Sequence, residues 1–177
     1  MKVVCFAAQS LAQSARAMAG VDPITSPPLS LANFDPQVMA GAGLVFFKMH
    51  GLEGQPFWYG DNAITACSAE QLARAPIAGA LVFAANCWGG DKSPMVQALL
   101  TAGAECVITG TGLNMAGTTR AAGADNLGRW WRWALRLGRD AFAAFQLAKV
   151  MSIGNTTFTV SVPGGATYTR VYWFAGK

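Results

Sequence analysis

The sequence is poor in charge and in histidine, and both shortages limit what the chain can do. Charged residues make up 12% of the 177 residues, hydrophobic residues make up 53%, and there is one histidine. A zinc site built from cysteine and histidine needs several such ligands close together, and the four cysteines contain no CxxC pair. The composition argues against a zinc site, and we expect neither a metal nor a cofactor.

The chain also lacks long apolar runs and a strong net charge. No apolar run reaches the roughly 20 residues that a membrane-spanning helix needs. A signal peptide needs a longer apolar stretch than the one near the N-terminus, which Gln9, Ser10 and Gln13 interrupt. A net charge of +4 does not by itself indicate nucleic-acid binding. We therefore expect a cytoplasmic protein with no membrane span, no nucleic-acid partner and no disulfides.

The length fits a single domain over residues 1–177. A domain of this size buries roughly 70% of the surface that its unfolded chain exposes. Because few charged residues remain to coat the outside, an apolar contact surface for a partner or for a second copy is an open possibility.

Continuous apolar runs of strand length recur along the chain, at residues 3–8, 44–49, 80–85 and 106–109. Continuous rather than alternating runs are typical of parallel strands that are covered on both faces. Helical segments are expected between them, at residues 10–19, 68–75 and 93–102. This alternation predicts a three-layer α/β sandwich whose mostly parallel sheet is flanked by helices.

The remaining segments complete the expected architecture. Residues 22–36 and 111–126 are rich in small and polar residues and are interpreted as loops. One long amphipathic helix is expected at residues 127–151, because its apolar positions recur at three or four residues. Residues 158–162 and 167–174, joined by a Pro-Gly-Gly turn, predict a hairpin or paired strands at the C-terminal edge.

Two of the apolar runs end in residues that carry chemistry. The run at residues 44–49 leads into His50 and Gly51, and the run at residues 80–85 leads to Cys87. Ligands of parallel α/β sheets bind beyond the carboxyl ends of the strands. If these two strands are neighbours, His50 and Cys87 lie side by side at that edge.

His50 and Cys87 are suited to nucleophilic catalysis. Cysteine attacks as a thiolate, and a nearby imidazole can take the thiol proton or stabilise the thiolate. The backbone N–H groups of Gly51 and Cys87 could donate to the oxyanion that develops on a substrate carbonyl. The pattern predicts a dyad with His50 as base and Cys87 as nucleophile.

The order of these pieces resembles the caspase-like cysteine peptidases, a group that includes caspases, gingipain-like and legumain-like enzymes, separases and CHAT domains. It is most similar to a minimal CHAT domain, in which a strand ending in His-Gly is followed by a hairpin like residues 59–65, a helix and the cysteine strand. Residues 100–104, 106–108 and 173–177 resemble the later segments of a CHAT domain: the end of a helix, the strand after it and the C-terminal strand. The resemblance covers about residues 1–177 and implies a caspase-like sheet and an endopeptidase that acts on a protein or peptide substrate.

The resemblance also suggests where substrate is recognised. An acidic pocket is common where a basic residue is cleaved, and Glu53 and Asp91 lie just past the two catalytic strand ends. The tryptophan-centred motif that CHAT domains usually carry is replaced here by residues 110–115. This difference, and the larger size of many members, imply that the substrate-recognition part is reduced or supplied by another molecule.

Other features leave alternatives open. The glycine-rich residues 109–117 could cradle a phosphate, but their spacing is not GxGxxG, and a loop bordering the active site is the better interpretation. Cys5 and Cys106 lie within apolar runs and are expected to be packed and inert, and Cys67 has no catalytic context either.

A basic stripe marks the expected long helix. Its members are Arg129, Arg132, Arg136 and Arg139. They form either the solvent-exposed face of an amphipathic helix or a binding site for an acidic partner, RNA or a membrane surface. A further alternative for the whole chain is a catalytically silent module that self-associates or binds a partner through its apolar surface.

Overall fold

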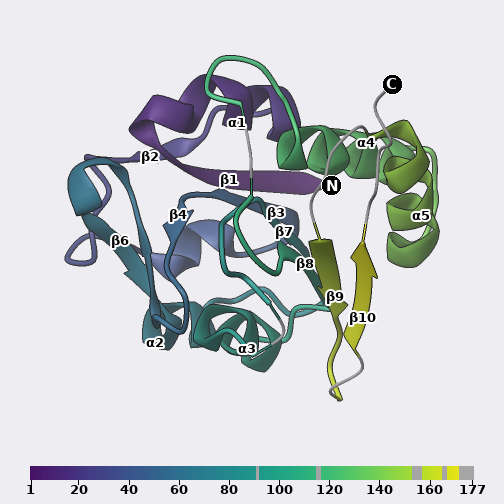
Figure 1. Cartoon of the computed structure of the whole chain (residues 1–177). Helices are drawn as coiled ribbons and strands as arrows, with labels where there is room; N and C mark the ends of the chain where they lie inside the picture. The colour runs from purple at the N-terminus through teal and green to yellow at the C-terminus, as the bar shows by residue number, and fades with distance from the viewer. Residues whose placement is uncertain (91, 115–116, 153–156, 165–166, 172–177) are drawn as a thin grey trace.

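The computed structural model describes residues 1–90, 92–114, 117–152 and 157–164 and the backbone of residues 167–171. The strands of its main sheet are β1 (Lys2–Ala8), β2 (Ile24–Ser26), β3 (Ala42–Lys48), β7 (Leu81–Ala84), β8 (Cys106–Gly110), β9 (Thr157–Ser161) and β10 (Thr167–Val171). Their order across the sheet is β2-β1-β3-β7-β8-β9-β10 (Figure 1). The strands from β2 to β8 are parallel, and the β8-β9 and β9-β10 pairs are antiparallel. The mostly parallel α/β sheet and its C-terminal hairpin, both predicted from the sequence, are confirmed.

Helices cover both faces of this sheet. They are α1 (Ala12–Ala19), α2 (Ala69–Ala73), α3 (Pro94–Thr101), α4 (Ala124–Arg136) and α5 (Ala141–Met151). Helices α1, α4 and α5 lie on one face, and α2 and α3 lie on the other (Figure 1). No helix in the described part of the chain is both long enough and apolar enough to cross a membrane.

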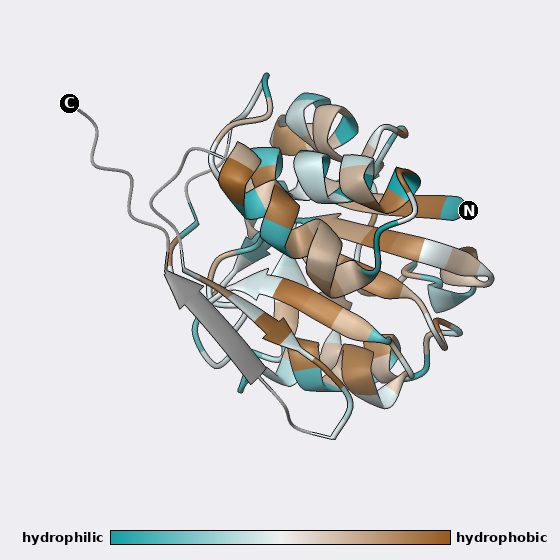
Figure 2. Ribbon diagram, turned by 90° about the vertical axis from the view of Figure 1, so that its right-hand side faces the viewer, coloured by the Kyte–Doolittle hydropathy of each residue, from teal (hydrophilic) through white to brown (hydrophobic). Residues whose placement is uncertain are grey.

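The two faces of the sheet each build a core, as continuous apolar strands require. Along β3, Leu44 and Phe46 join the cluster beneath α1, α4 and α5, whereas Val45 and Phe47 join the cluster above α2 and α3. Burying each such side chain contributes about 1.5–3 kcal/mol. Figure 2 shows the apolar strands enclosed between the two helix layers.

Local signals explain where the helices begin. Helix α2 has the expected capping box: the Gln71 N–H donates to Ser68 Oγ at 3.2 Å, and the Ser68 N–H donates to Gln71 Oε1 at 3.1 Å. Helix α3 starts with Pro94, whose fixed φ and missing N–H suit the first turn.

The prediction of a single long helix at residues 127–151 is wrong, because this part of the chain forms two helices, α4 and α5. Gly138 adopts a φ of 78°, a left-handed conformation that ends the first helix. Asp140 then caps the second helix, since its side chain accepts the N–H of Ala143 at 2.8 Å. The break folds α5 back against α4, so that both helices cover the same face of the sheet (Figure 1).

A short strand within an expected loop is a second correction. Strand β2 lies within residues 22–36 and extends the parallel sheet beside β1. A separate antiparallel sheet contains β4 (His50–Gly51), β5 (Phe57–Tyr59) and β6 (Thr65–Ser68), and its β5-β6 pair is the hairpin expected at residues 59–65. Strands of two to four residues carry too little periodicity to be recognised from sequence. Residues 173–177, which the sequence analysis compared with CHAT domains, lie outside the described residues.

Candidate functional site

The strands that lead to His50 and Cys87 are neighbours. Strands β3 and β7 pair in parallel, with Phe47 opposite Ala84. Beyond the strand ends the Ala85 N–H donates to the Phe47 carbonyl at 2.8 Å. If the register is continued beyond the ends of β3 and β7, His50 comes level with Cys87 at the carboxyl edge of the sheet.

Gly51 brings the two motifs into contact. A Cβ atom at this buried position would overlap the carbonyl oxygen of Cys87, so only glycine allows the two backbones to lie this close. His50 precedes Gly51 in the same short strand and its side chain is 54% exposed, whereas Cys87 is partly buried. The structure thus places Gly51 against Cys87, with His50 directly before Gly51 in the chain.

The segment after β8 covers Cys87. The backbone N–H of Asn114 donates to Cys87 Sγ at 3.3 Å, and the thiol faces the Asn114 carbonyl at 3.8 Å. The next residue, Trp88, has a φ of 57°, an uncommon conformation for a bulky residue. This turn is fastened by the Trp88 N–H, which donates to the Gly112 carbonyl at 2.9 Å. Cys87 therefore lies on a constrained turn between β7 and the segment after β8.

Two buried asparagines hold this edge together, and the sequence analysis identified neither. The Asn86 side chain accepts the Met49 N–H at 2.8 Å, which ties the end of β3 to the residue before Cys87. The Asn114 side chain donates to the Asn86 carbonyl at 2.5 Å. Among the described residues, Asn86 Nδ2 and Asn114 Oδ1 have no hydrogen-bond partner. A polar residue that ends an otherwise apolar run, as Asn86 does, was the available signal.

The His50 imidazole lies beside a carboxylate. Its Nε2 atom is 3.6 Å from Oδ1 of Asp61. Asp61 also accepts two hydrogen bonds from Ser10: the backbone N–H binds Oδ2 at 2.7 Å and the hydroxyl binds Oδ1 at 2.7 Å. Burial alone would raise the pKa of Asp61, but the hydrogen bonds from Ser10 and the contact with His50 outweigh it and lower the pKa.

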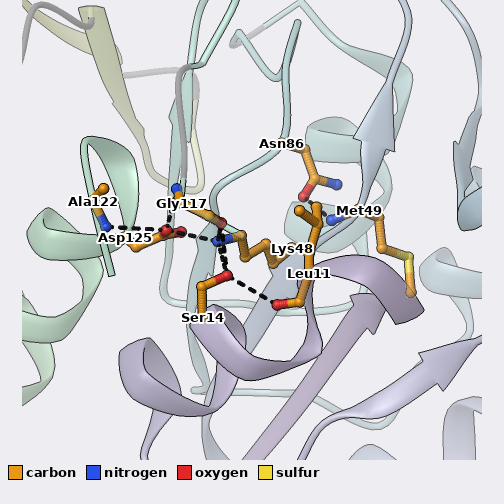
Figure 3. Close-up of polar contacts among 8 residues, drawn as sticks. All are labelled: Leu11, Ser14, Lys48, Met49, Asn86, Gly117, Ala122 and Asp125. Carbon is orange, nitrogen blue, oxygen red and sulfur yellow. Dashed lines mark hydrogen bonds and ion pairs between the residues drawn. The ribbon is translucent and has the colours of Figure 1, made fainter. Parts of the chain in front are cut away.

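A buried ion pair lies behind the site (Figure 3). Lys48, two residues before His50, contacts Asp125 Oδ2 at 2.6 Å, and both side chains are almost wholly buried. The same ammonium donates to Ser14 Oγ at 2.5 Å and to the Gly117 carbonyl at 2.7 Å. Asp125 Oδ2 accepts the Gly117 N–H at 2.9 Å and the Ala122 N–H at 3.3 Å. The pair therefore ties β3 to α1, to α4 and to the segment between β8 and α4.

The expected substrate-binding carboxylates are only partly placed. Glu53 is exposed and lines a surface hollow of about 340 Å³ beside the turn at Trp88. Lys92 lines the same hollow, so its charge is mixed rather than acidic. Asp91 lies outside the described residues.

The other cysteines differ from Cys87. Cys5, Cys67 and Cys106 are buried and unpaired. Burial raises the pKa of Cys5 and that of Cys106 to about 12, and it also raises the pKa of Cys67. These three thiols are protonated and shielded at neutral pH, as expected for packed residues.

The basic stripe is interrupted on the folded chain. Arg132 is partly buried and its Nε donates to the Met18 carbonyl at 3.1 Å, so this residue helps to join α4 to α1. Burial, together with the charges of Arg136 and Arg129, lowers the pKa of Arg132. Arg129, Arg136 and Arg139 are exposed.

The site has to be interpreted from its own geometry. The chain matches no model of a known protein family, and a comparison with characterised proteins finds no match either.

Proposed function

We propose that this protein is a cysteine endopeptidase of the caspase-like type, with a dyad of His50 and Cys87. The observation that carries the proposal is the backbone contact between Gly51 and Cys87 at the carboxyl edge of two adjacent parallel strands. This edge is where parallel α/β sheets bind their ligands. The order of motifs around it is the one that resembles a minimal CHAT domain.

The reaction begins at Cys87. His50 takes the thiol proton, and Sγ attacks the carbonyl carbon of the scissile peptide bond. His50 then gives its proton to the leaving amine, which leaves an acyl-enzyme thioester that water hydrolyses. The hydrogen bond from the Asn114 N–H holds Sγ of Cys87 in place at the end of the turn.

Backbone N–H groups support the negative charge that develops on the substrate carbonyl. Those of Gly51 and Cys87 are the proposed donors. No carbonyl among the described residues accepts the Cys87 N–H, which supports this role. The hollow lined by Glu53 and Lys92 is the proposed place for a substrate side chain, and Asp91 remains part of that proposal.

The setting proposed for this chemistry is the cytoplasm. A reducing compartment keeps a nucleophilic cysteine in its thiol or thiolate form, and the four cysteines are unpaired.

The test is alkylation by iodoacetamide, mapped by mass spectrometry at a series of pH values. Wild-type protein, His50→Ala and Cys106→Ala are compared, the last as a control that removes a buried thiol. We expect fast labelling confined to Cys87, slowed in His50→Ala and unchanged in Cys106→Ala. A screen of peptide substrates follows, with Cys87→Ala as the inactive control. Cys87 labelling that is slow and independent of His50 would contradict the dyad.

A second candidate function is that of a catalytically silent module that self-associates or binds a partner. It is favoured by exposed apolar side chains on and beside α4 and α5, among them Trp133, Leu137, Val150 and Met151. Sedimentation velocity over a range of protein concentrations tests self-association, and a monomer at all concentrations would count against it.

A further inference from the structure

Asp61 is held against His50 by a turn with unusual backbone geometry. Strand β5 places Tyr59 opposite His50, and Asp61 lies just beyond the end of that strand. The next two residues, Asn62 and Ala63, both have a φ of 56°. Left-handed conformations at two successive residues other than glycine are uncommon, and such strain persists only where the surrounding structure imposes it.

The close packing of Gly60 helps to impose this turn. A Cβ atom at Gly60 would overlap Ser26 at the end of β2. The Gly60 N–H donates to the Ile64 carbonyl at 2.8 Å, which closes the turn around Asp61. The carboxylate is therefore placed by two elements, the main sheet through Ser26 and the small sheet through β5.

Ser10 fixes the orientation of the carboxylate. It lies two residues beyond the end of β1, and its backbone N–H and hydroxyl each bind one oxygen of Asp61 at 2.7 Å. Hydrogen bonds to an ionised group are shorter and stronger than neutral ones. With both oxygens held, Oδ1 stays aimed at the imidazole before any substrate arrives.

The geometry points to Asp61 as a positioning residue for His50, with Ser10 as its support; this inference rests on the proposed peptidase function. Nε2 of His50 faces Oδ1 of Asp61 at 3.6 Å, so the carboxylate favours a proton on Nε2 and leaves the lone pair on Nδ1 to take the thiol proton of Cys87. The proton moves from sulfur to Nδ1, the ring becomes an imidazolium, and the carboxylate stays ionised and stabilises that cation. Nδ1 later returns the proton to the leaving amine.

Neighbouring groups leave Asp61 as the main electrostatic influence on the ring. Tyr59 is opposite His50 in the β4-β5 ladder, and Cys87 lies across from it beyond β7. Among the described residues, Asp61 is the charged side chain within ion-pair distance of the imidazole.

The test uses the fact that the chain contains a single histidine. The ¹H–¹³C spectrum of the His50 ring is followed against pH in wild-type protein, Asp61→Asn and Asp22→Asn. Asp22 also carries a carboxylate, but in an exposed ion pair with Arg16, so its variant removes the same charge elsewhere. We expect the ring titration in Asp61→Asn to move to lower pH than in wild type, because the variant removes the negative charge beside the imidazolium. We expect little change in Asp22→Asn.

The consequence for Cys87 is measured on the same proteins. Alkylation of Cys87 near neutral pH should slow severalfold in Asp61→Asn. Ser10→Ala should slow it by less, and Asp61→Glu should restore part of the rate. For cleavage of a peptide, kcat should fall while KM stays unchanged, because Asp61 acts through the ring rather than on the substrate.

The possible outcomes separate the inference from the proposed function. An unmoved ring titration in Asp61→Asn overturns the role of Asp61, even if wild-type Cys87 is fully reactive. A shifted titration with unchanged Cys87 alkylation overturns it as well. If wild-type alkylation is slow and unaffected by His50→Ala, the proposed function itself fails and the inference falls with it.

Discussion

Replacing Lys48 by methionine tests the buried ion pair behind the site. The Lys48 ammonium has three N–H donors, and three acceptors surround it: Ser14 Oγ, the Gly117 carbonyl and Asp125 Oδ2. Methionine keeps much of the apolar stem but removes the charge and all three donors. Asp125 then stays buried, with the N–H groups of Gly117 and Ala122 as its remaining partners.

The expected cost follows from the burial of both side chains, which are 1% and 0% exposed. Burial lowers the pKa of Lys48 and raises that of Asp125, and in each case the partner's charge opposes the shift. Removing one member of a buried pair leaves an uncompensated charge and typically costs about 3–5 kcal/mol of unfolding free energy. For a chain of this length, that lowers Tm by roughly 6–20 °C.

Urea denaturation followed by tryptophan fluorescence measures the effect, because Trp131 is buried against Phe83 and reports unfolding. The double variant Lys48→Met with Asp125→Asn removes both charges, and the asparagine oxygen can still accept the two N–H groups. The double variant should be more stable than the two single costs predict, by at least about 1.5 kcal/mol. Arg16→Met, which breaks an exposed pair with Asp22, should cost less than about 1 kcal/mol.

Additive costs for Lys48→Met and Asp125→Asn would refute this reasoning, as would a cost of Lys48→Met no larger than that of the exposed control. The pair would then contribute little to holding the segment between β8 and α4.

Three further predictions address backbone geometry and pH. Gly51→Ala should abolish peptide cleavage and destabilise the fold, because its Cβ would overlap the Cys87 carbonyl; Gly112→Ala, where a Cβ meets open space, is the matched control in activity and thermal-melt assays. Gly138→Ala should cost about 1 kcal/mol in urea denaturation, because the φ of 78° disfavours a Cβ although the site is open, and no measurable cost would contradict this. The lowered pKa of Asp61 gives stability that is present above its ordinary value of 3.8 and is lost as pH falls through the folded-state value; Asp61→Asn should flatten the acid side of the stability profile, and an unchanged slope below pH 4 would count against the effect.

The main sheet could be predicted because its strands are continuous apolar runs. Both faces of β3 are buried, so every residue from Leu44 to Phe47 is apolar, and the same holds for β7. Runs of this kind give the parallel sheet and its carboxyl edge directly. The ends of two such runs predicted that His50 and Cys87 lie at the same edge of the sheet. The backbone contact between Gly51 and Cys87 is consistent with that prediction.

The supporting contacts could not be predicted, because they join residues far apart in the chain. Lys48 and Asp125 are separated by 77 positions, and nothing local marks them as partners. A lysine within a strand buried on both faces does call for a counter-charge, but sequence spacing does not say which carboxylate supplies it. The same limit applies to Ser10 and Asp61, 51 positions apart.

The break between α4 and α5 was missed for a different reason. Apolar residues on either side of Gly138 keep a helical spacing, since both helices pack on the same face of the sheet. Periodicity therefore continues through a position where the backbone does not. The glycine followed by Asp140 was the signal, because a left-handed residue ends a helix and an aspartate begins one.

Two contacts of the segment between β8 and α4 bear on the candidate site. At one point Asn114 contacts Cys87 Sγ and the Asn86 carbonyl, and at the other Gly117 contacts Lys48 and Asp125. Lys48 in turn lies two residues before His50 on the same strand. A change at the ion pair can therefore reach Cys87 through this segment and His50 through β3. If His50 and Cys87 form the proposed dyad, the buried pair contributes to the position of both residues, which would offset the desolvation that its charges cost.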